Sequence, residues 1–293
     1  MTDEASRLNV PKHIGQGKPG RRSSGRMGPL DLRLLIYEEA LKLRQAGCSY
    51  KKVISSIENQ YGVRLAKSTL STWVNGTHTP FGGVNLFLPK ATPELAYAIG
   101  VLTGDASLNL KQNHYEYRIR LQAIDREFVE AFDEAVSKVL RCPTHRLWKG
   151  QAREIHVEIG SYLLHKFLQK PLRELMPFIE HDSECSSAFL RGFFDSEGSV
   201  SLNGALTAFN TDLELLRYVQ MLLARRFGIE STGPHLGSRK GSILHKRGRS
   251  YFRNSDCYRI YIRTNSLRTF SREIGLTIDR KRVRLERKVH SSD

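Results

Sequence analysis

Cysteine is scarce in this chain of 293 residues, and its spacing excludes two classes of small stabilised fold. The four cysteines lie far apart and include no CxxC pair, so neither a structural zinc site nor a disulfide framework is expected. We interpret them as buried thiols of a reducing compartment. No apolar run approaches the roughly 20 residues that a membrane-spanning helix needs. We therefore expect a soluble cytoplasmic protein without a membrane partner.

Acidic residues are too few to balance the basic ones. The chain has 46 Lys and Arg against 30 Asp and Glu, which gives a formal net charge of +16 and a pI near 9.9. Such an excess favours a polyanionic partner, most simply nucleic acid, and a location at the nucleoid. The alternative is a generally basic protein that has no such partner.

The first third of the chain separates into a tail, a helical segment and a linker. Residues 1–28 are rich in Gly, Ser, Lys and Arg without a period, which predicts a disordered basic tail. Residues 29–78 show three short helical patterns that resemble a helix-turn-helix DNA-binding domain, and residues 79–91 are typical of a linker. In this interpretation the third helix faces a major groove with Lys67, Ser68, Thr69 and Thr72. A plain three-helix cap on the main domain is the alternative.

The remainder of the chain contains an internal repeat. The segment LAYAIGVLTGDASL (95–108) aligns with SAFLRGFFDSEGSV (187–200), so that Gly100 matches Gly192 and Asp105 matches Glu197. Each copy reads as an apolar helix followed by an acid, a small residue and a strand. We expect Thr92 to cap the first helix, with Pro93 at its first position, and Ser186 or Ser187 to cap the second.

The segments after each copy also match, in the order two strands, helix, two strands, helix. Sequential strands joined by tight turns indicate antiparallel sheets. The sequence therefore predicts an α+β fold of two pseudo-symmetric αββαββα units, residues 92–182 and 183–293, preceded by the small all-α domain.

Glycines and acids in the repeat indicate what the two helices do together. Gly100, Gly104 and Gly192 carry no side chain that would separate two helix backbones, so we expect the helices to cross there. Their carboxyl ends then bring Asp105 and Glu197 side by side. A helix carboxyl end already carries partial negative charge, which makes acids unfavourable there. A divalent cation, most simply Mg²⁺, would offset this repulsion.

These residues resemble the paired signature helices of the LAGLIDADG homing endonucleases. FLRGFFDSEGS is a close and specific match, AIGVLTGDASL is an imperfect one, and the resemblance covers roughly residues 90–288. It implies a monomer with two saddle-shaped sheets, whose metal-binding acids, here Asp105 and Glu197, hydrolyse both DNA strands. Asp195 matches a common non-catalytic acid of the motif. Gln122 is the candidate for the polar residue that assists catalysis.

One departure from the family pattern is the residue after Asp105. The family usually has glycine there, and this chain has Ala106. If the position needs a positive φ, alanine is strained by about 1 kcal/mol. Such strain would displace Asp105 and slow cleavage.

Two strands predict a surface that binds DNA independently of the signature helices. In YEYRIRLQ and CYRIYIRT, apolar and polar residues alternate, so that each strand has one basic face. A basic face on an antiparallel ribbon can contact both bases and phosphates. We expect the strand REIHVEIG, whose polar face is acidic, at the sheet periphery, and residues 238–253 as a long hairpin tip. The predicted DNA-binding residues of these strands and the hairpin are Arg118, Arg120, Gln122, Arg259, Tyr261, Arg263, Arg239, Lys240 and Lys246.

The sequence thus favours a Mg²⁺-dependent, site-specific double-strand DNA endonuclease of the intron-homing type. The first alternative is a protein that kept the fold and lost cleavage, either a transcription regulator that binds DNA or a maturase that binds intron RNA. The second alternative is a structural RNA-binding protein, which the net charge alone permits.

Overall fold

A computed structural model describes residues 30–78, 80, 87–111, 116–141, 148–149, 154–246 and 249–291. The chain divides into two compact units, residues 1–80 and 81–293. The predicted tail, residues 1–28, lies outside the described residues, as do 79 and 81–86 of the predicted linker. Within the described ranges, no helix has the length and apolar character that crossing a membrane would require.

The first unit is a three-helix domain with a core of its own. It contains α1 (Leu30–Gln45), α2 (Tyr50–Tyr61) and α3 (Lys67–Val74). The Ser49 side chain caps α2, and Gly62 ends that helix in the left-handed conformation. Trp73 is buried at the centre and meets the Tyr37 ring edge-on at 5.3 Å. Because these helices bury their apolar residues against one another, the unit has the core that an independent fold requires.

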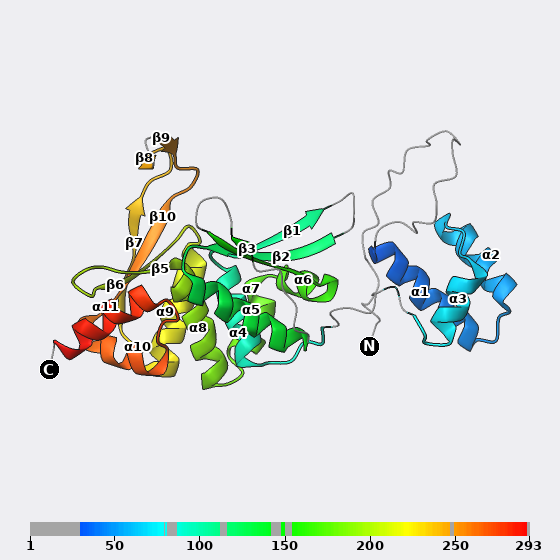
Figure 1. Ribbon diagram of the computed structural model, residues 1–293, viewed down its shortest axis with the longest axis horizontal. Coiled ribbons are helices and arrows are strands. Elements are labelled where there is room, and N and C mark those ends of the chain that lie inside the picture. The colour runs from blue at the N-terminus through cyan, green and yellow to red at the C-terminus, as the bar shows by residue number, and fades with distance from the viewer. Residues whose placement is uncertain are drawn as a thin grey trace, which may run out of the picture. The chain divides into compact units, whose positions relative to one another are not determined.

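The second unit contains two four-stranded antiparallel sheets, which lie on one side of a layer of helices (Figure 1). The strand orders are β1-β2-β4-β3 and β5-β6-β10-β7. The strands of the first sheet are β1 (Ser107–Lys111), β2 (Glu116–Ala123), β3 (Trp148–Lys149) and β4 (Ile155–Gly160). Those of the second are β5 (Gly198–Val200), β6 (Leu206–Asn210), β7 (Ser231–Ser238) and β10 (Cys257–Ile262). A separate hairpin, β8 (Ile243–Lys246) and β9 (Arg249–Phe252), extends beyond β7 and β10. The α+β fold class predicted from the sequence is confirmed.

The helix layer repeats in the two halves of the unit. The first half contributes α4 (Pro93–Leu102), α5 (Arg126–Leu140), α6 (Tyr162–Leu168) and α7 (Leu172–Ile179). The second contributes α8 (Ser183–Glu197), α9 (Leu213–Phe227), α10 (Leu267–Glu273) and α11 (Asp279–His290). One continuous core joins both halves. The segment of α7 was not predicted as a helix; Pro171 immediately before it and Pro177 within it weaken the helical pattern.

The two central helices begin differently from each other. The Thr92 hydroxyl accepts from the Leu95 amide and Pro93 is the first residue of α4, as predicted. The prediction that Ser186 or Ser187 caps α8 is wrong, because the Asp182 carboxylate accepts from the Cys185 amide at 2.7 Å and starts the helix earlier. Both serines lie inside α8 and donate to carbonyls of neighbouring segments. A carboxylate at a helix amino end also interacts favourably with the helix dipole.

Candidate active site

Helices α4 and α8 touch through their backbones at two glycines, and a third glycine lies in the turn after α4, against the side chains at the end of α8. A Cβ on Gly100 would lie 2.2 Å from the Phe189 carbonyl oxygen, and one on Gly192 would lie 2.4 Å from the Tyr97 carbonyl oxygen. A Cβ on Gly104 would lie 2.5 Å from the Ser196 Cβ. No ordinary side chain fits at such distances, so the glycines set how closely the two helices approach.

The close approach brings Asp105 and Glu197 together. Glu197 is the last residue of α8, whereas Asp105 lies in the turn after α4, which ends at Leu102. The side chain of Glu197 runs beside Gly104, where a Cβ would lie 2.9 Å from its Oε1 atom. Burial, and then the negative charge of Asp105, raise the pKa of Glu197 to about 7. The pKa of Asp105 is also raised, chiefly because its carboxyl is partly withdrawn from water.

This carboxylate pair has the chemistry of a site for a hard divalent cation. Two ionised carboxylates close enough for the charge of one to raise the pKa of the other repel. Mg²⁺ or Ca²⁺ takes oxygen ligands of this kind. The donors present therefore fit the cation that the sequence predicts. A different cluster, His181, Asp182 and Cys185, also brings potential ligand atoms within 4.8 Å of one another. It lies at the opposite end of α8, roughly 20 Å away at 1.5 Å per residue, and both Asp182 oxygens are already occupied by His181 and the Cys185 amide.

Asp195, two residues before Glu197, has a structural role. Its side chain is 1% exposed, one oxygen accepts from the Tyr97 hydroxyl at 3.1 Å, and the other accepts from the Thr277 amide at 2.9 Å. Burial raises its pKa, and the two hydrogen bonds oppose that effect. Asp195 thereby ties α4, α8 and the segment before α11 together.

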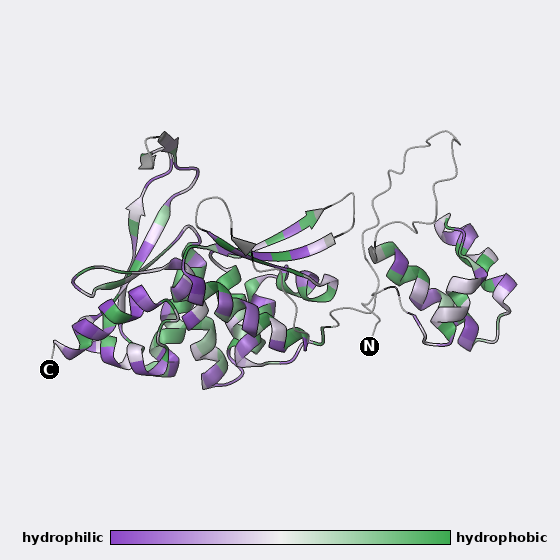
Figure 2. Cartoon of the chain, in the orientation of Figure 1, coloured by the Kyte–Doolittle hydropathy of each residue, from purple (hydrophilic) through white to green (hydrophobic). Residues whose placement is uncertain are grey.

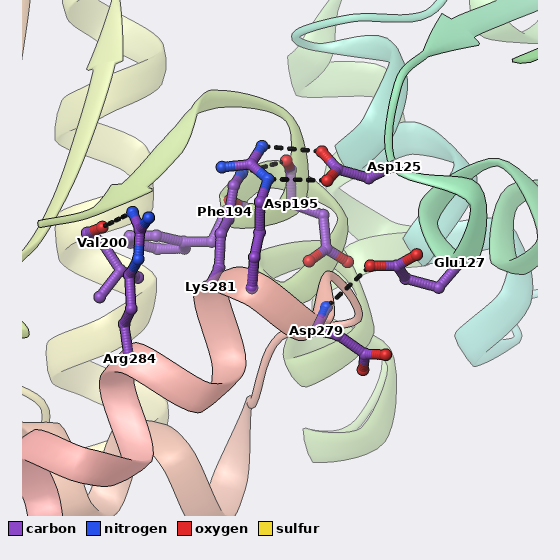
Figure 3. Close-up of polar contacts among 9 residues, drawn as sticks. Asp125, Glu127, Phe194, Asp195, Val200, Asp279, Lys281 and Arg284 are labelled. Atoms are coloured by element: carbon purple, nitrogen blue, oxygen red, sulfur yellow. Dashed lines mark hydrogen bonds and ion pairs between the residues drawn. The ribbon is translucent and has the colours of Figure 1, made fainter. Parts of the chain in front are cut away.

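A buried lysine near the acids was missed in the sequence. Lys281 of α11 is 5% exposed, and its Nζ donates to the carbonyl oxygens of Asp195 at 2.5 Å and Phe194 at 3.2 Å (Figure 3). Its charge opposes the rise in the pKa of both Asp105 and Glu197. From the sequence we predicted that only a metal ion would offset the negative charge at this helix end. The structure places the ammonium of Lys281 there. Lys281 and Leu285 are the buried residues of α11, so a lysine four residues before a leucine on the apolar stripe was the available signal.

The expected strain at Ala106 is absent. Among the described residues other than glycine, Arg141 alone has a positive φ, so Ala106 has an ordinary backbone conformation. Its counterpart Gly198 has φ −80° and ψ 145°, which any residue adopts. Glycine is needed at 198 for another reason, because a Cβ there would lie 2.2 Å from the Phe194 carbonyl oxygen. Ala106 therefore gives no backbone argument for a displaced Asp105.

Gln122 lies on the polar face of β2, near the turn that carries Asp105. The antiparallel register pairs Ser107 with Arg120, and continuing it by two residues places Gln122 opposite Asp105. Its amide donates to Glu154 and accepts from Arg120 at 3.0 Å. In the second half Gly198 pairs with Ala208, so the same rule places Phe209 opposite Glu197. The two halves therefore present different groups beside their acids.

The basic face of the first sheet is partly balanced by Glu158 of the neighbouring strand. The prediction that REIHVEIG lies at the periphery is wrong, because its strand β4 pairs with β2 between β2 and β3. Arg118 forms an ion pair with Glu158, and Arg120 contacts the His156 ring nitrogen at 2.6 Å. Cross-strand pairing brings opposite charges together here.

The second sheet and the hairpin keep more of their positive charge. The Arg259 guanidinium stacks over the Tyr261 ring at 5.3 Å. Arg263, just past β10, is the exception, because it forms an ion pair with Glu230 at 3.6 Å. Arg239 and Lys240 are exposed between β7 and β8, and Lys246 ends β8.

In the first unit the four predicted DNA-binding residues lie on α3. Lys67 and Ser68 are exposed, and Thr69 is half-buried. The Thr72 hydroxyl donates to the Thr69 carbonyl at 2.9 Å, so its hydrogen atom is already engaged within the helix.

Comparison with known proteins identifies the family. The family model of the LAGLIDADG-like domain matches residues 184–275, which include most of α8, the second sheet and α10. A protein of Methanocaldococcus jannaschii, MJ0398, is 34% identical over 265 residues, which are 89% of this chain and 95% of that protein. The chain belongs to the LAGLIDADG family. A second M. jannaschii protein, MJ0314, is 28% identical over 156 residues, 51% of this chain and 55% of its own length. Both relatives are described as uncharacterised.

Solved structures similar to this LAGLIDADG protein include I-DmoI in complex with DNA and Mn, with a TM-score of 0.48 and 20% identity. That match covers 64% of this chain and 98% of I-DmoI. Full-length DUF199/WhiA from Thermotoga maritima has a TM-score of 0.43 and 16% identity, and covers 70% of this chain and 63% of its own.

Proposed function

We propose that this LAGLIDADG protein is a site-specific endonuclease that cuts both strands of DNA with the help of a divalent cation. The observation that carries the proposal is the meeting of Asp105 and Glu197, one carboxylate from each half, at the backbone contact of α4 and α8. A monomer would suffice, because both halves belong to one chain.

The residues of the site divide the work. Asp105 and Glu197 hold the cation through their carboxylate oxygens, and Gln122, opposite Asp105, orients the attacking water or the phosphate. When bound, the cation supplies Lewis-acid stabilisation of the charge that develops on the scissile phosphate. Because Phe209 occupies the equivalent place in the second half, the two strands are expected to be cut at unequal rates, so that a nicked product accumulates first.

The DNA would lie along the two sheets. One face of these strands packs on the core and buries Ile119, Leu121 and Ile260. The opposite face carries polar side chains. Arg259, Arg263, Arg239 and Lys240 supply contacts to phosphates, with Lys246 at the end of β8, while the α3 residues Lys67, Ser68, Thr69 and Thr72 extend the recognised sequence. Many moderate contacts of this kind suit a long target site.

A second candidate function is DNA binding without cleavage, as in a transcription regulator. One observation favours it: Lys281 already supplies a positive charge to the acid pair. The fold therefore keeps its acids without depending on a metal ion.

A cleavage assay separates the two candidates. The purified full chain would be incubated with a plasmid library of randomised target sites, in Mg²⁺ and in chelator, and cut sites would be found by end sequencing. Reproducible Mg²⁺-dependent double-strand breaks at one sequence support the endonuclease. Sequence-specific binding in both conditions, without a break, supports the regulator, and preference for structured RNA contradicts both.

The arginines of the two sheets are expected to differ in their contribution to DNA affinity. Replacing Arg259 by Gln should weaken binding and reduce the slope of log affinity against log salt by about 0.9, because one phosphate contact is lost. Replacing Arg118 by Gln should change the slope less, because Glu158 already balances that charge. Binding measured by fluorescence anisotropy over a salt series gives both slopes. Arg217→Gln, exposed on α9 beside Glu214, is the charge-matched control. Equal slopes for the Arg259 and Arg118 variants would contradict the asymmetry.

A further inference from the structure

The carboxyl end of α8 is capped by a helix that lies outside the matched domain. The family model ends at residue 275, whereas α11 begins at Asp279. Most of α11 is hydrophilic (Figure 2), yet Lys281 points inward to two carbonyls of the last turn of α8. The last four carbonyls of a helix lack partners within it. The Phe194 carbonyl also accepts from the Gly198 amide, so the buried ammonium chiefly satisfies the Asp195 carbonyl, which would otherwise be costly.

Contacts around Lys281 fix α11 to both halves of the molecule (Figure 3). The Arg280 guanidinium forms two hydrogen bonds of 2.7 Å with the Asp125 carboxylate, and the Asp279 amide donates to Glu127 at 2.9 Å. Asp125 and Glu127 belong to the start of α5 in the first half. In the second half, Arg284 donates to the Val200 carbonyl at 3.1 Å. Lys281 is thus held in place from two directions.

The charges near Lys281 are those of the candidate site. Burial lowers the pKa of Lys281, the Asp195 carboxylate raises it, the neighbouring Arg280 charge lowers it, and Asp105 and Asp125 raise it. The negative end of the α8 dipole adds to the attraction. Conversely, the charge of Lys281 acts on both members of the acid pair, Asp105 and Glu197.

We propose that Lys281 is a positioning residue: it is the resident cation of the site, and it fixes the end of α8 so that Glu197 faces Asp105 before any metal ion binds. The link of this role to catalysis rests on the proposed endonuclease function. The role itself does not, because it concerns the metal-free protein.

A double-mutant cycle in chelator, without DNA, tests the proposal. Lys281→Met is expected to lower the unfolding midpoint of the full chain by roughly 5–10 °C, because it leaves buried carboxylates without their cation. Adding Glu197→Gln should recover part of this loss, and more than the same change gains in the wild type. Arg282→Gln removes an exposed charge from the same helix, where it pairs with Asp279 and Glu286, and should be additive with Glu197→Gln. Additivity of Lys281→Met with Glu197→Gln would overturn the proposal.

A second measurement covers the case in which Lys281→Met does not fold. Hydrogen exchange of the wild-type peptide around residues 194–200 is compared in chelator and in Mg²⁺. Equal protection is expected, since Lys281 already orders this segment. Protection that appears only with Mg²⁺ would show that the metal ion, and not Lys281, fixes the helix end.

These results separate the two proposals. Coupling between Lys281 and Glu197 in a wild type that cuts no DNA would end the endonuclease proposal and leave the positioning role intact. Additive effects of Lys281→Met and Glu197→Gln in a protein that cuts DNA would end the positioning role and leave the endonuclease proposal intact.

Discussion

The variants Asp105→Asn and Glu197→Gln are each expected to lose DNA cleavage by at least about 100-fold, the scale on which one electrostatic contact to a transition state is lost. Each removes half of the carboxylate pair that would hold the divalent cation. DNA binding in chelator should be retained or tightened, because each change removes a negative charge from the vicinity of the DNA. Cleavage would be measured in single-turnover experiments, and binding by gel shift.

The Glu197→Gln variant should also be more stable than the wild type at alkaline pH in chelator. The pKa of Glu197 in the folded protein is about 7, above its ordinary value of 4.5. An acid whose pKa is raised by folding lowers stability once it is ionised, so the cost grows as the pH rises from about 4.5 through 7 and is complete above it. The glutamine removes this cost, so the variant should gain unfolding temperature at pH 8 and little at pH 4.

This combination gives the prediction its control. An inactive variant that is at least as stable as the wild type has lost chemistry and not structure. If either variant cleaved DNA as fast as the wild type, the carboxylate pair would not be part of the mechanism. Loss of folding at pH 8 in the Glu197→Gln variant would contradict the electrostatic account of the site.

Gly192→Ala is expected to destabilise the protein by at least about 3 kcal/mol. By helix propensity alone this change would stabilise α8 by about 1 kcal/mol. The new Cβ would however lie 2.4 Å from the Tyr97 carbonyl oxygen and 3.0 Å from the Val101 amide nitrogen, both backbone atoms that cannot rotate away. The sign of the measured change therefore distinguishes close helix contact from an ordinary helical glycine. Chemical denaturation followed by circular dichroism gives the free energy of unfolding.

A glycine in open surroundings provides the comparison. At Gly160, at the end of β4, the nearest atom to an added Cβ is the Tyr117 carbonyl oxygen at 4.0 Å. Gly160→Ala should change stability by no more than about 0.5 kcal/mol. A stabilised Gly192→Ala variant would mean that α4 and α8 are further apart than described.

Much of the second unit could be predicted from local patterns. Its two halves repeat the same order of elements, so that a pattern found in one half could be checked in the other. Alternation in YRIRLQ and CYRIYI predicted which residues would be buried, and Ile119, Leu121, Ile260 and Ile262 are. The glycines of the paired helices predicted close contact, since only the absence of a side chain permits it. These signals act over a few residues of sequence, where period and residue type suffice.

What could not be predicted depends on contacts between distant segments. Lys281 lies in a basic stretch that reads as a solvated surface, and its inward position follows from the packing of α11 against α8, 86 residues away in sequence. The acids of the β4 segment suggested repulsion of DNA until the strand order showed that β4 pairs with β2, where Glu158 forms an ion pair with Arg118. The cap of α8 was misplaced because serine and aspartate are both good caps, and tertiary contacts occupy the serines.

The two halves end in different helices, and this difference affects any attempt to engineer a symmetric homodimer from one half. In chain order α7 stands in the first half where α11 stands in the second, and its buried residues are Leu175 and Ile179 rather than a lysine. A homodimer engineered from two copies of the first half would bring two Asp105 carboxylates to its twofold axis without an internal ammonium. Such a symmetric protein would carry the repulsion between these carboxylates without the ammonium that opposes it here.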